Sequence, residues 1–402
     1  MVRKILYFAM LFLVLHMSSA MAQERSDDTL AADSSNFVTA SLVVSAPSEA
    51  LYSVFGHLAL RMECPTHQLD YIFTFESDTD VNAFMTFIAG KAQARYIAVP
   101  GSVFINDGQA IGREIKQYKL NLTHHEKQEL WRLLDNDMMA GSNRHFNLLF
   151  DNCVHSTIAN IQACLVDDEF EWGPTHPPYD QCDGDVFRQV IHPSPWAEFI
   201  YITVVGTIYD NHSAMEYRTS PETLIPLLRE ARLVDKVTGE KRPVITDEGT
   251  VLVKERQHLK ATPFSPLVAF GTLLAVTLLV TLAEWRWGKR KKARVFDMLL
   301  FTAQALIGLL LLFITFYSEL FDSNWNWYLI IFNPLPLLFL LFCRKKQPSM
   351  IWWSSYSAVL TGFLLATPFL KVLDLPHQLI TGSLLVRSLS LLFQAKKKKT
   401  SK

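Results

Sequence analysis

The sequence is poor in cysteine and shows no compact metal-binding pattern. Only 5 of its 402 residues are cysteine, too few for a disulfide-rich scaffold of this length. A metal site would have to be drawn from His57, Cys64, His67, Cys153 and His155, whose spacing matches none of the short patterns of structural zinc sites. We therefore expect no metal and no other cofactor.

An excess of charge of either sign is also absent. Lysine and arginine together number 38 and aspartate and glutamate 39, for a formal net charge of -1. This balance gives no sign of a nucleic-acid-binding surface, and we expect no nucleic-acid partner. The near-neutral total hides a strong segregation, because the last third of the chain consists of apolar runs separated by basic segments.

The first residues have the features of a secretory signal. The segment MVRKILYFAMLFLVLHMSSAMAQ starts with basic residues, continues with an apolar stretch and ends in the small-residue pattern Ala20-Met21-Ala22. These features predict a signal peptide over 1–22, with an uncleaved anchor as the alternative. No cysteine stands directly after the cleavage position, so the chain itself does not resemble a lipoprotein.

Apolar runs after Pro263 predict a membrane domain over 261–395. Most of them approach the roughly 20 residues that a membrane-spanning helix needs. They lie at about 264–283, 295–317, 327–343, 350–371 and 378–393. The last run is short and contains Arg387, so four spans, with this segment along the surface, are the alternative to five.

The segments between the apolar runs predict the orientation. RWGKRKKAR, CRKKQ and the tail at 396–402 are basic, whereas SELFDSNWNWY is acidic and aromatic. Basic loops stay in the cytoplasm, so we expect the tail there and residues 23–260 on the other side. An odd number of spans fits this arrangement. The prediction is a multi-pass protein of the bacterial inner membrane with a periplasmic domain.

Residues 23–260 show strand and helix patterns in alternation. Strands are predicted from VTASLVVSA, HLALRM, LDYIFTF, RYIAVP, EIKQYKLN and HFNLLF. Helices are predicted from VNAFMTFIAG and from THHEKQELWRLLDND, where Thr123 and Glu126 form a capping-box pattern. The fold class is therefore α+β, an antiparallel sheet packed by a few helices, followed by an all-α membrane domain.

The stretch FDNCVHSTIANI places Cys153 at the beginning of a predicted helix, with Asp151 or Asn152 as the cap. The positive end of the helix dipole stabilises a thiolate there, and the Cys153 N–H is placed to bind an oxyanion. A thiolate also needs a base. His57 is the best candidate, because Gly56 before it allows a close approach of the backbone. A buried structural thiol is the competing interpretation.

The remaining thiols offer another interpretation. The exported domain contains Cys64, Cys153, Cys164 and Cys182, and an oxidising compartment favours pairing, with three possible full connectivities. Cys153 and Cys164 lie too far apart along one helix to pair. Because Cys164 and Cys182 flank a loop rich in Pro, Gly and Asp, they are the predicted bridge, and Cys153 would stay reduced.

Four stretches resemble the Lnb family, the Bacteroides-type lipoprotein N-acyltransferases: LYSVFGHLALRM, DYIFTF, NLLFDNCVHSTI and YRTSPETLIPLL. The resemblance covers most of the chain after the signal. It implies an exported N-terminal domain, a multi-helix membrane region, and acyl transfer by a cysteine and a histidine, which fall on Cys153 and His57.

HLALRM and NCVH also resemble the permuted papain-like fold of lecithin–retinol acyltransferase relatives, in which a strand histidine precedes an Asn-Cys-x-His helix start. This likeness implies a third polar residue that orients the histidine. Asp70, Thr74 and His67 are the candidates, and the pattern does not choose between them. Arg61 is a weaker candidate for binding a substrate phosphate, since a surface arginine is the simpler interpretation.

These likenesses imply an enzyme that transfers an acyl chain from a membrane phospholipid onto Cys153, as a thioester, and then to the α-amine of a diacylated lipoprotein. Both substrates are lipids, which accounts for the membrane domain. A membrane-anchored cysteine peptidase or amidase would use the same pair of residues, and a non-enzymatic membrane scaffold would not need the thiol. Both alternatives stay open at this point.

Overall fold

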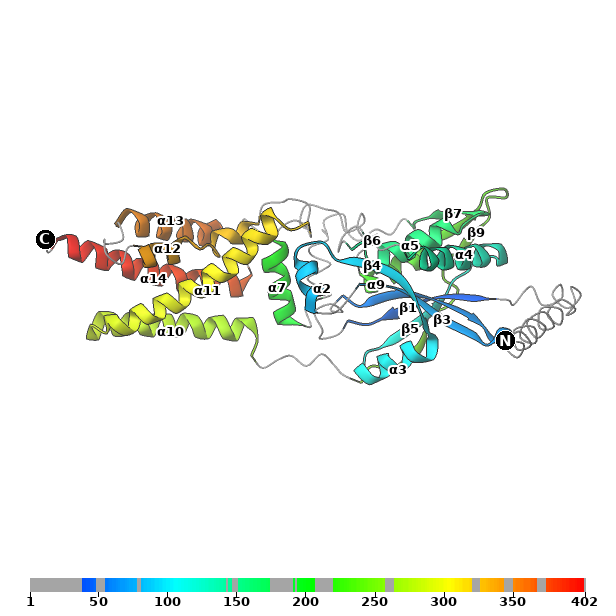
Figure 1. Ribbon diagram of the computed structural model, residues 1–402, viewed down its shortest axis with the longest axis horizontal. Helices are drawn as coiled ribbons and strands as arrows, with labels where there is room; N and C mark the ends of the chain where they lie inside the picture. The colour runs from blue at the N-terminus through cyan, green and yellow to red at the C-terminus, as the bar shows by residue number, and fades with distance from the viewer. Residues whose placement is uncertain are drawn as a thin grey trace, which may run out of the picture.

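The computed structural model describes residues 38–47, 55–77, 81–141, 144–146, 151–173, 191, 194–206, 220–256, 264–319, 326–342, 350–366 and 374–400. It places a β-rich domain at one end and a helical bundle at the other, with helix α7 (Pro195–Val205) between them (Figure 1). The predicted α+β class of the first domain and the all-helical second domain are confirmed. The predicted signal at 1–22 and Cys182 lie outside the described residues.

An antiparallel sheet forms the centre of the first domain. Within the described residues it has seven strands in the order β10-β5-β1-β2-β3-β4-β6. Their bounds are β1 Thr39–Ser45, β2 His57–Cys64, β3 Leu69–Ser77, β4 Gln93–Pro100, β5 Ile115–Lys119, β6 Arg144–His145 and β10 Thr250–Val253. The five strands predicted before HFNLLF are confirmed as β1 to β5, whereas only the first residue of HFNLLF falls in a described strand, the short β6.

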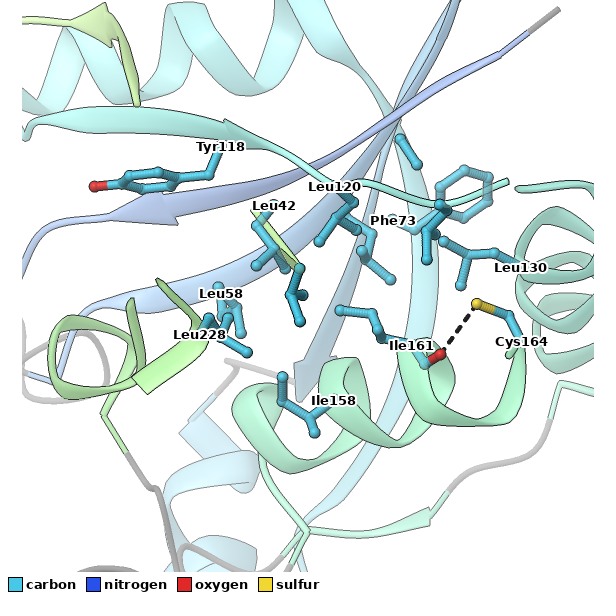
Figure 2. Close-up of a cluster of buried hydrophobic side chains, with 14 of the residues drawn as sticks. Leu42, Leu58, Phe73, Tyr118, Leu120, Leu130, Ile158, Ile161, Cys164 and Leu228 are labelled. Carbon is cyan, nitrogen blue, oxygen red and sulfur yellow. Dashed lines mark hydrogen bonds between the residues drawn. The ribbon is translucent and has the colours of Figure 1, made fainter. Parts of the chain in front are cut away.

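The larger core of this domain lies between one face of the sheet and three helices, α4 (His124–Ala140), α5 (Cys153–Ala163) and α9 (Pro221–Glu230). Figure 2 shows Leu58 of β2 and Ile161 of α5 in this core. Alternate residues of a strand point to the same face. Leu58, Leu60 and Met62 of β2 therefore share one side, and their burial against α5 holds that helix on β2 and β3.

The opposite face is covered by α3 (Gly101–Ile111), whose Phe104 packs with Ala59 and Ile72. This helix was not predicted, because glycines at its start and middle and few apolar residues weaken the helical pattern. A side chain at Gly101 would clash with Asp70, because a Cβ there would lie 2.3 Å from the carboxylate oxygens of Asp70.

Helix α4 confirms the predicted capping box. The Glu126 N–H donates to Thr123 Oγ1 at 3.2 Å, and the Thr123 N–H donates to Glu126 Oε2 at 2.8 Å. Glu126 also accepts a hydrogen bond from Arg242 at 2.7 Å. Arg242 contacts the carboxylate of Asp168 as well. The cap therefore ties α4 to a second described sheet, in the order β7-β8-β9, whose strands are Asp168–Glu171, Arg232–Asp235 and Lys241–Pro243.

The helices of the bundle follow the predicted apolar runs. Their bounds are α10 Pro266–Trp287, α11 Arg290–Phe316, α12 Leu335–Phe342, α13 Met350–Ala366 and α14 Leu375–Thr400, with a short 3-10 helix, η5, at Trp327–Ile330. Among the described residues, α10 and α11 are long and apolar enough to cross a membrane, and α13 is a shorter apolar helix. The number of spans stays a prediction.

Arg387, which made the last run doubtful, is completely buried in the bundle. Its guanidinium donates to both carboxylate oxygens of Asp297 on α11, at 2.6 and 2.9 Å, and to Glu284 of α10 at 3.1 Å. A charge inside a membrane domain is tolerated when it faces the interior and is paired. Helix α14 therefore packs against α10 and α11, with Arg387 in the interior of the bundle.

One end of the bundle contacts the sheet domain. The Ser318 hydroxyl donates to the Ile88 carbonyl at 2.6 Å, and the Glu319 N–H donates to the Ala89 carbonyl at 3.0 Å, so the end of α11 touches the end of α2 (Val81–Ile88). We call this the domain-facing end of the bundle. The α10–α11 turn and the C-terminus, both rich in lysine, lie at the opposite end (Figure 1).

Candidate active site

Helix α5 begins at Cys153, as predicted, and Asn152 is its cap. The Asn152 side-chain oxygen accepts hydrogen bonds from the backbone N–H groups of Val154 at 2.8 Å and His155 at 3.0 Å. Asp151 is not the cap, although its carboxylate accepts a hydrogen bond from Ser156 Oγ of the first turn at 3.0 Å. The amide oxygen of Asn152 and the carboxylate of Asp151 therefore both stabilise the start of the helix. The half-buried Cys153 occupies the positive end of the helix dipole.

His57 is the first residue of β2, and Gly56 brings it there. Gly56 has a φ of 77° in the left-handed region, and a Cβ at this position would lie 2.7 Å from the Ser45 carbonyl oxygen. Ser45 is also the cross-strand partner of His57. Only glycine fits such a close approach at positive φ, so the predicted role of Gly56 is confirmed.

His57 and Cys153 form a hydrogen-bonded pair. Burial by itself lowers the pKa of the His57 imidazole, but the attraction of the Cys153 thiolate, the hydrogen bond with Cys153 and the charge of Glu76 together outweigh burial and raise this pKa to about 9. Burial likewise raises the pKa of the Cys153 thiol, but the charge of His57, its hydrogen bond and the Leu58 N–H together hold that pKa below its usual range. Opposite charges at close range stabilise each other's charged form. The pair therefore favours a thiolate beside an imidazolium.

Of the three candidates for an orienting residue, the structure brings Thr74 to His57. Thr74 is fully buried on β3, and its Oγ1 lies 2.5 Å from His57 Nε2. The same hydroxyl donates to Glu76 Oε1 at 2.9 Å, and Glu76 Oε1 lies 3.4 Å from His57 Nε2. The sequence analysis missed Glu76. In the pairing of β2 with β3, Ala59 lies opposite Thr74, so His57, two residues earlier, lies opposite Glu76. The register of this hairpin was therefore the signal that could have identified Glu76.

Asp70 and His67 lie away from His57. Asp70 accepts two hydrogen bonds of 2.7 Å from Arg61 and packs against Gly101 at the start of α3. His67 is exposed in the 3-10 turn at Pro65–His67, after the far end of β2. Neither position can orient the imidazole of His57.

Arg61 does not act as the predicted phosphate ligand. It is 9% exposed and, besides Asp70, donates to Gln117 Oε1 at 2.6 Å. Gln117 in turn donates to Glu63 at 2.9 Å and to Ser41 at 3.1 Å. A buried guanidinium needs such partners, because a buried charge without them is costly. The role of Arg61 is to hold this polar network between the strands.

Cys164 does not form the predicted disulfide. It is a free, fully buried thiol that ends helix α5, and its sulfur donates to the Ile161 carbonyl at 3.0 Å (Figure 2). Its side chain lies in the hydrophobic core beside Leu130, not toward a loop. Burial, and next the charge of Glu126, raise its pKa to about 12. Cys64 is also a free, buried thiol.

No metal cluster forms around the predicted residues. Within the described part of the chain, no three His, Cys, Asp or Glu side chains gather as metal ligands. His155 lies on α5, and its Nδ1 is 3.2 Å from the side-chain oxygen of Asn152. His155 therefore belongs to the helix cap rather than to the pair of His57 and Cys153.

A cavity of about 440 Å³ lies between the ends of β1 and β5 and helix α9. Val44 lines this cavity and is the cross-strand partner of Leu58, the residue whose N–H faces the Cys153 sulfur. Phe55, two residues before His57, lines it too. The cavity thus adjoins the strand that carries His57, but neither His57 nor Cys153 lines it.

The fold and this pair define a class: an α+β domain with a cysteine at a helix start beside a strand histidine, followed by a bundle of apolar helices. Residues 23–180 match the family model described as the Lnb N-terminal periplasmic domain, and residues 257–399 match the Lnb transmembrane domain. The chain belongs to the Lnb family. It is a membrane protein with a periplasmic portion, related to lipoprotein N-acylation, and membership suggests an acyltransferase. No curated protein and no solved structure matches the chain.

Proposed function

We propose that this protein is an apolipoprotein N-acyltransferase that transfers an acyl chain from a phospholipid, through a thioester on Cys153, to the α-amine of a diacylglyceryl-cysteine lipoprotein. The observation that carries the proposal is the pair of His57 and Cys153, with its raised imidazole pKa and lowered thiol pKa, at the start of α5. Membership of a family related to lipoprotein N-acylation supplies the substrate class.

The first half-reaction uses the pair in its charged form. The Cys153 thiolate attacks the ester carbonyl carbon of the phospholipid, and the N–H groups at the start of α5 face the oxyanion that forms. The carbon–oxygen bond then breaks. The lysophospholipid oxygen takes the proton of the His57 imidazolium, and the acyl chain stays on sulfur as a thioester.

The second half-reaction needs His57 as a base. The α-amine of the lipoprotein attacks the thioester carbonyl, and the now neutral His57 accepts the proton of the amine. The carbon–sulfur bond breaks, which regenerates the Cys153 thiolate and the imidazolium and releases an amide. Because a thioester is a higher-energy acyl group than an amide, the transfer needs no nucleotide.

Thr74 and Glu76 act on His57 rather than on the substrate. Thr74 lies against Nε2, which leaves Nδ1 of the ring for Cys153. A hydroxyl bonded to one nitrogen of an imidazole fixes the orientation of the ring, and a nearby carboxylate favours its protonated form. Glu76 raises the pKa of His57 in this way. Thr74 is thus the orienting group, and Glu76 supports the imidazolium.

We also propose that the protein resides in the inner membrane with five spans. The domain over 23–260 would be periplasmic, the membrane domain would occupy 261–395, and the basic tail at 396–402 would be cytoplasmic. The lysine-rich α10–α11 turn and C-terminus lie together at the end of the bundle opposite the sheet domain (Figure 1), which supports this topology. A reporter fused after Lys402 should be active only in the cytoplasm, and export of that reporter would favour four spans.

Trapping the acyl-enzyme tests the mechanism. Full-length protein is incubated with phospholipid vesicles without lipoprotein, digested at low pH, and analysed by mass spectrometry. We expect an acyl group on the peptide that contains Cys153, and its removal when a synthetic diacylated lipopeptide is added. Cys153→Ser should lose both signals, and Cys164→Ala should keep them. An unmodified Cys153 together with normal lipopeptide N-acylation would exclude the proposed mechanism, and cleavage of a peptide instead would favour the peptidase.

A further inference from the structure

Helix α7 lies between the sheet domain and the bundle (Figure 1) and belongs structurally to the bundle. Its Phe199 and Ile202 are part of the buried apolar cluster formed by bundle helices, and Trp196 packs against that cluster. The Trp196 Nε1–H also donates to the Phe264 carbonyl, just before α10, at 2.6 Å. Helix α7 is thus anchored at its first turn to the domain-facing end of the bundle.

Two side chains of the bundle hold the other end of α7. Asn326, before η5, donates its amide hydrogens to the carbonyls of Thr203 at 3.0 Å and Val204 at 3.1 Å. The last carbonyls of a helix have no partner within it, so Asn326 satisfies them. His377 of α14 supplies a further contact, because its Nε2 lies 2.8 Å from the Thr203 hydroxyl.

His377 is fully buried and fully occupied by neighbours. Its Nδ1 contacts the carboxylate of Asp374, and its ring lies 4.6 Å from the ring of Phe199 and 4.3 Å from that of Tyr328. The Thr203 hydroxyl donates its single proton to the Phe199 carbonyl at 2.6 Å, so it accepts the hydrogen bond from His377. His377 and Thr203 are buried between the two helices, so the effect of this cluster of a histidine, a carboxylate and a hydroxyl is to fix α7 on α14.

The remaining side of α7 touches the catalytic segment. The ring of Tyr201 packs edge-on against the ring of Phe55, with 5.3 Å between centroids. Phe55 comes two residues before His57 and is joined to it only by Gly56. Helix α7 therefore links α14, which it meets through Thr203 and His377, to the segment that carries His57, which it meets through Tyr201 and Phe55.

We propose that α7 is a positioning helix, held by His377 and Asn326, that sets the Cys153–His57 pair at the membrane surface so that an ester in the bilayer reaches the thiolate. His377 and Tyr201 are positioning residues. This inference rests on the proposed function, since a reaction with a bilayer lipid is what needs a defined height above the membrane. A displacement of about 1 Å can cost on the order of 10²-fold in rate when the reacting groups must align.

The test compares two acyl donors with the same full-length protein in vesicles. One donor is a water-soluble ester, p-nitrophenyl butyrate, which reaches Cys153 from solution. The other is the phosphatidylethanolamine of the vesicle itself. The variants are Tyr201→Ala, which removes the ring that meets Phe55, and Thr203→Val, which removes the hydroxyl that meets His377 at nearly constant shape. Tyr201→Phe, which keeps the ring, and Ile200→Ala, at a residue of α7 that is 44% exposed, are the matched controls.

We expect Tyr201→Ala and Thr203→Val to lower acylation of Cys153 by the bilayer lipid by about 10-fold to 10²-fold while keeping the wild-type rate with the soluble ester. Both controls should match the wild type with both donors. An equal loss with both donors would show a merely structural helix and overturn the proposal, as would unchanged acylation by the lipid. If the wild-type protein acylates Cys153 with neither donor, the proposed function itself fails, which is a separate result.

Discussion

Two cysteines mark the two ends of helix α5, and their environments are opposite. Cys153 begins the helix, is half-buried, and has a pKa below the usual range, because the pairing with His57 overcomes the effect of burial. Cys164 follows the last residue of the helix, is fully buried in the core, and has a pKa raised to about 12. Eleven residues along one helix separate a thiol whose pKa is lowered from one whose pKa is raised.

The difference teaches that position, not residue type, sets the ionisation of a thiol, which is why the proposed nucleophile is Cys153 and not Cys164. The start of a helix presents free N–H groups and the positive end of the dipole, whereas its end presents carbonyl oxygens. Cys164 donates to one of these carbonyls, that of Ile161, which keeps the proton on sulfur. Under the proposed mechanism Cys164 is no rival for Cys153, since Cys164 is neither exposed nor ionised at neutral pH.

Alkylation should show the largest contrast between the two thiols. At pH 7 a thiol with a pKa of about 12 is ionised in roughly one molecule in 10⁵, and Cys164 is also shielded from solvent. We expect iodoacetamide to label Cys153 by several orders of magnitude faster than Cys164, as measured by mass spectrometry of the two peptides. Protein unfolded in urea is the control, in which both should react alike. Similar labelling rates in the folded protein would contradict the assigned environments.

Removal of His57 should make Cys153 behave more like an ordinary thiol. We expect His57→Ala to lower the rate of acylation by about 10² to 10⁴-fold, the usual contribution of a general acid and base, and to raise the pH at which Cys153 is alkylated. His155→Ala is the matched control, because this histidine lies on the helix of Cys153 but contacts Asn152 rather than the thiol. Full activity of His57→Ala with unchanged alkylation would assign the role to another residue.

Thr74→Val should have a smaller effect, because it disorients the imidazole without removing it. Loss of one hydrogen bond to a charged group corresponds to a rate loss of about 10-fold to 10²-fold. Asp70→Asn provides the comparison. It weakens the pairing with Arg61 and should lower the thermal midpoint of unfolding while leaving acylation near the wild-type rate. If Asp70→Asn lowers acylation more than Thr74→Val, the orienting role of Thr74 is wrong.

The pH profile should show the smallest of these effects. Because the pKa of His57 is raised to about 9, the imidazolium is lost, and acylation by a soluble ester falls, as the pH rises through about 9. The lowered pKa of Cys153 keeps the thiolate, and therefore activity, to lower pH than an ordinary thiol would. Glu76→Gln removes a negative charge 3.4 Å from His57 Nε2, so the alkaline limb should move to lower pH. An unchanged limb would show that Glu76 does not support the imidazolium.

Local patterns in the sequence were sufficient to predict most strands of the sheet and the two residues, His57 and Cys153, that the structure brings together. Alternation of apolar residues predicted β1 to β5, the Thr123–Glu126 box predicted the start of α4, and the Asp-Asn-Cys stretch predicted a helix that begins at Cys153. Each of these signals depends on residues within a few positions of one another, whose spacing determines the local backbone. His57 was found for the same reason, from the tight turn that Gly56 allows.

Contacts between residues far apart in the chain were decided only by the tertiary structure. The register of β2 against β3 selected Thr74 over Asp70 and His67 and added Glu76. Packing of α5 turned Cys164 into the core, and packing of the bundle paired Arg387 with Asp297. Helix α7 joined the bundle to Phe55 in the same way. In each case the outcome depends on which surfaces come into contact when distant segments pack. No local sequence pattern encodes such a contact, because the free energy of the contact depends on the side chains of both segments.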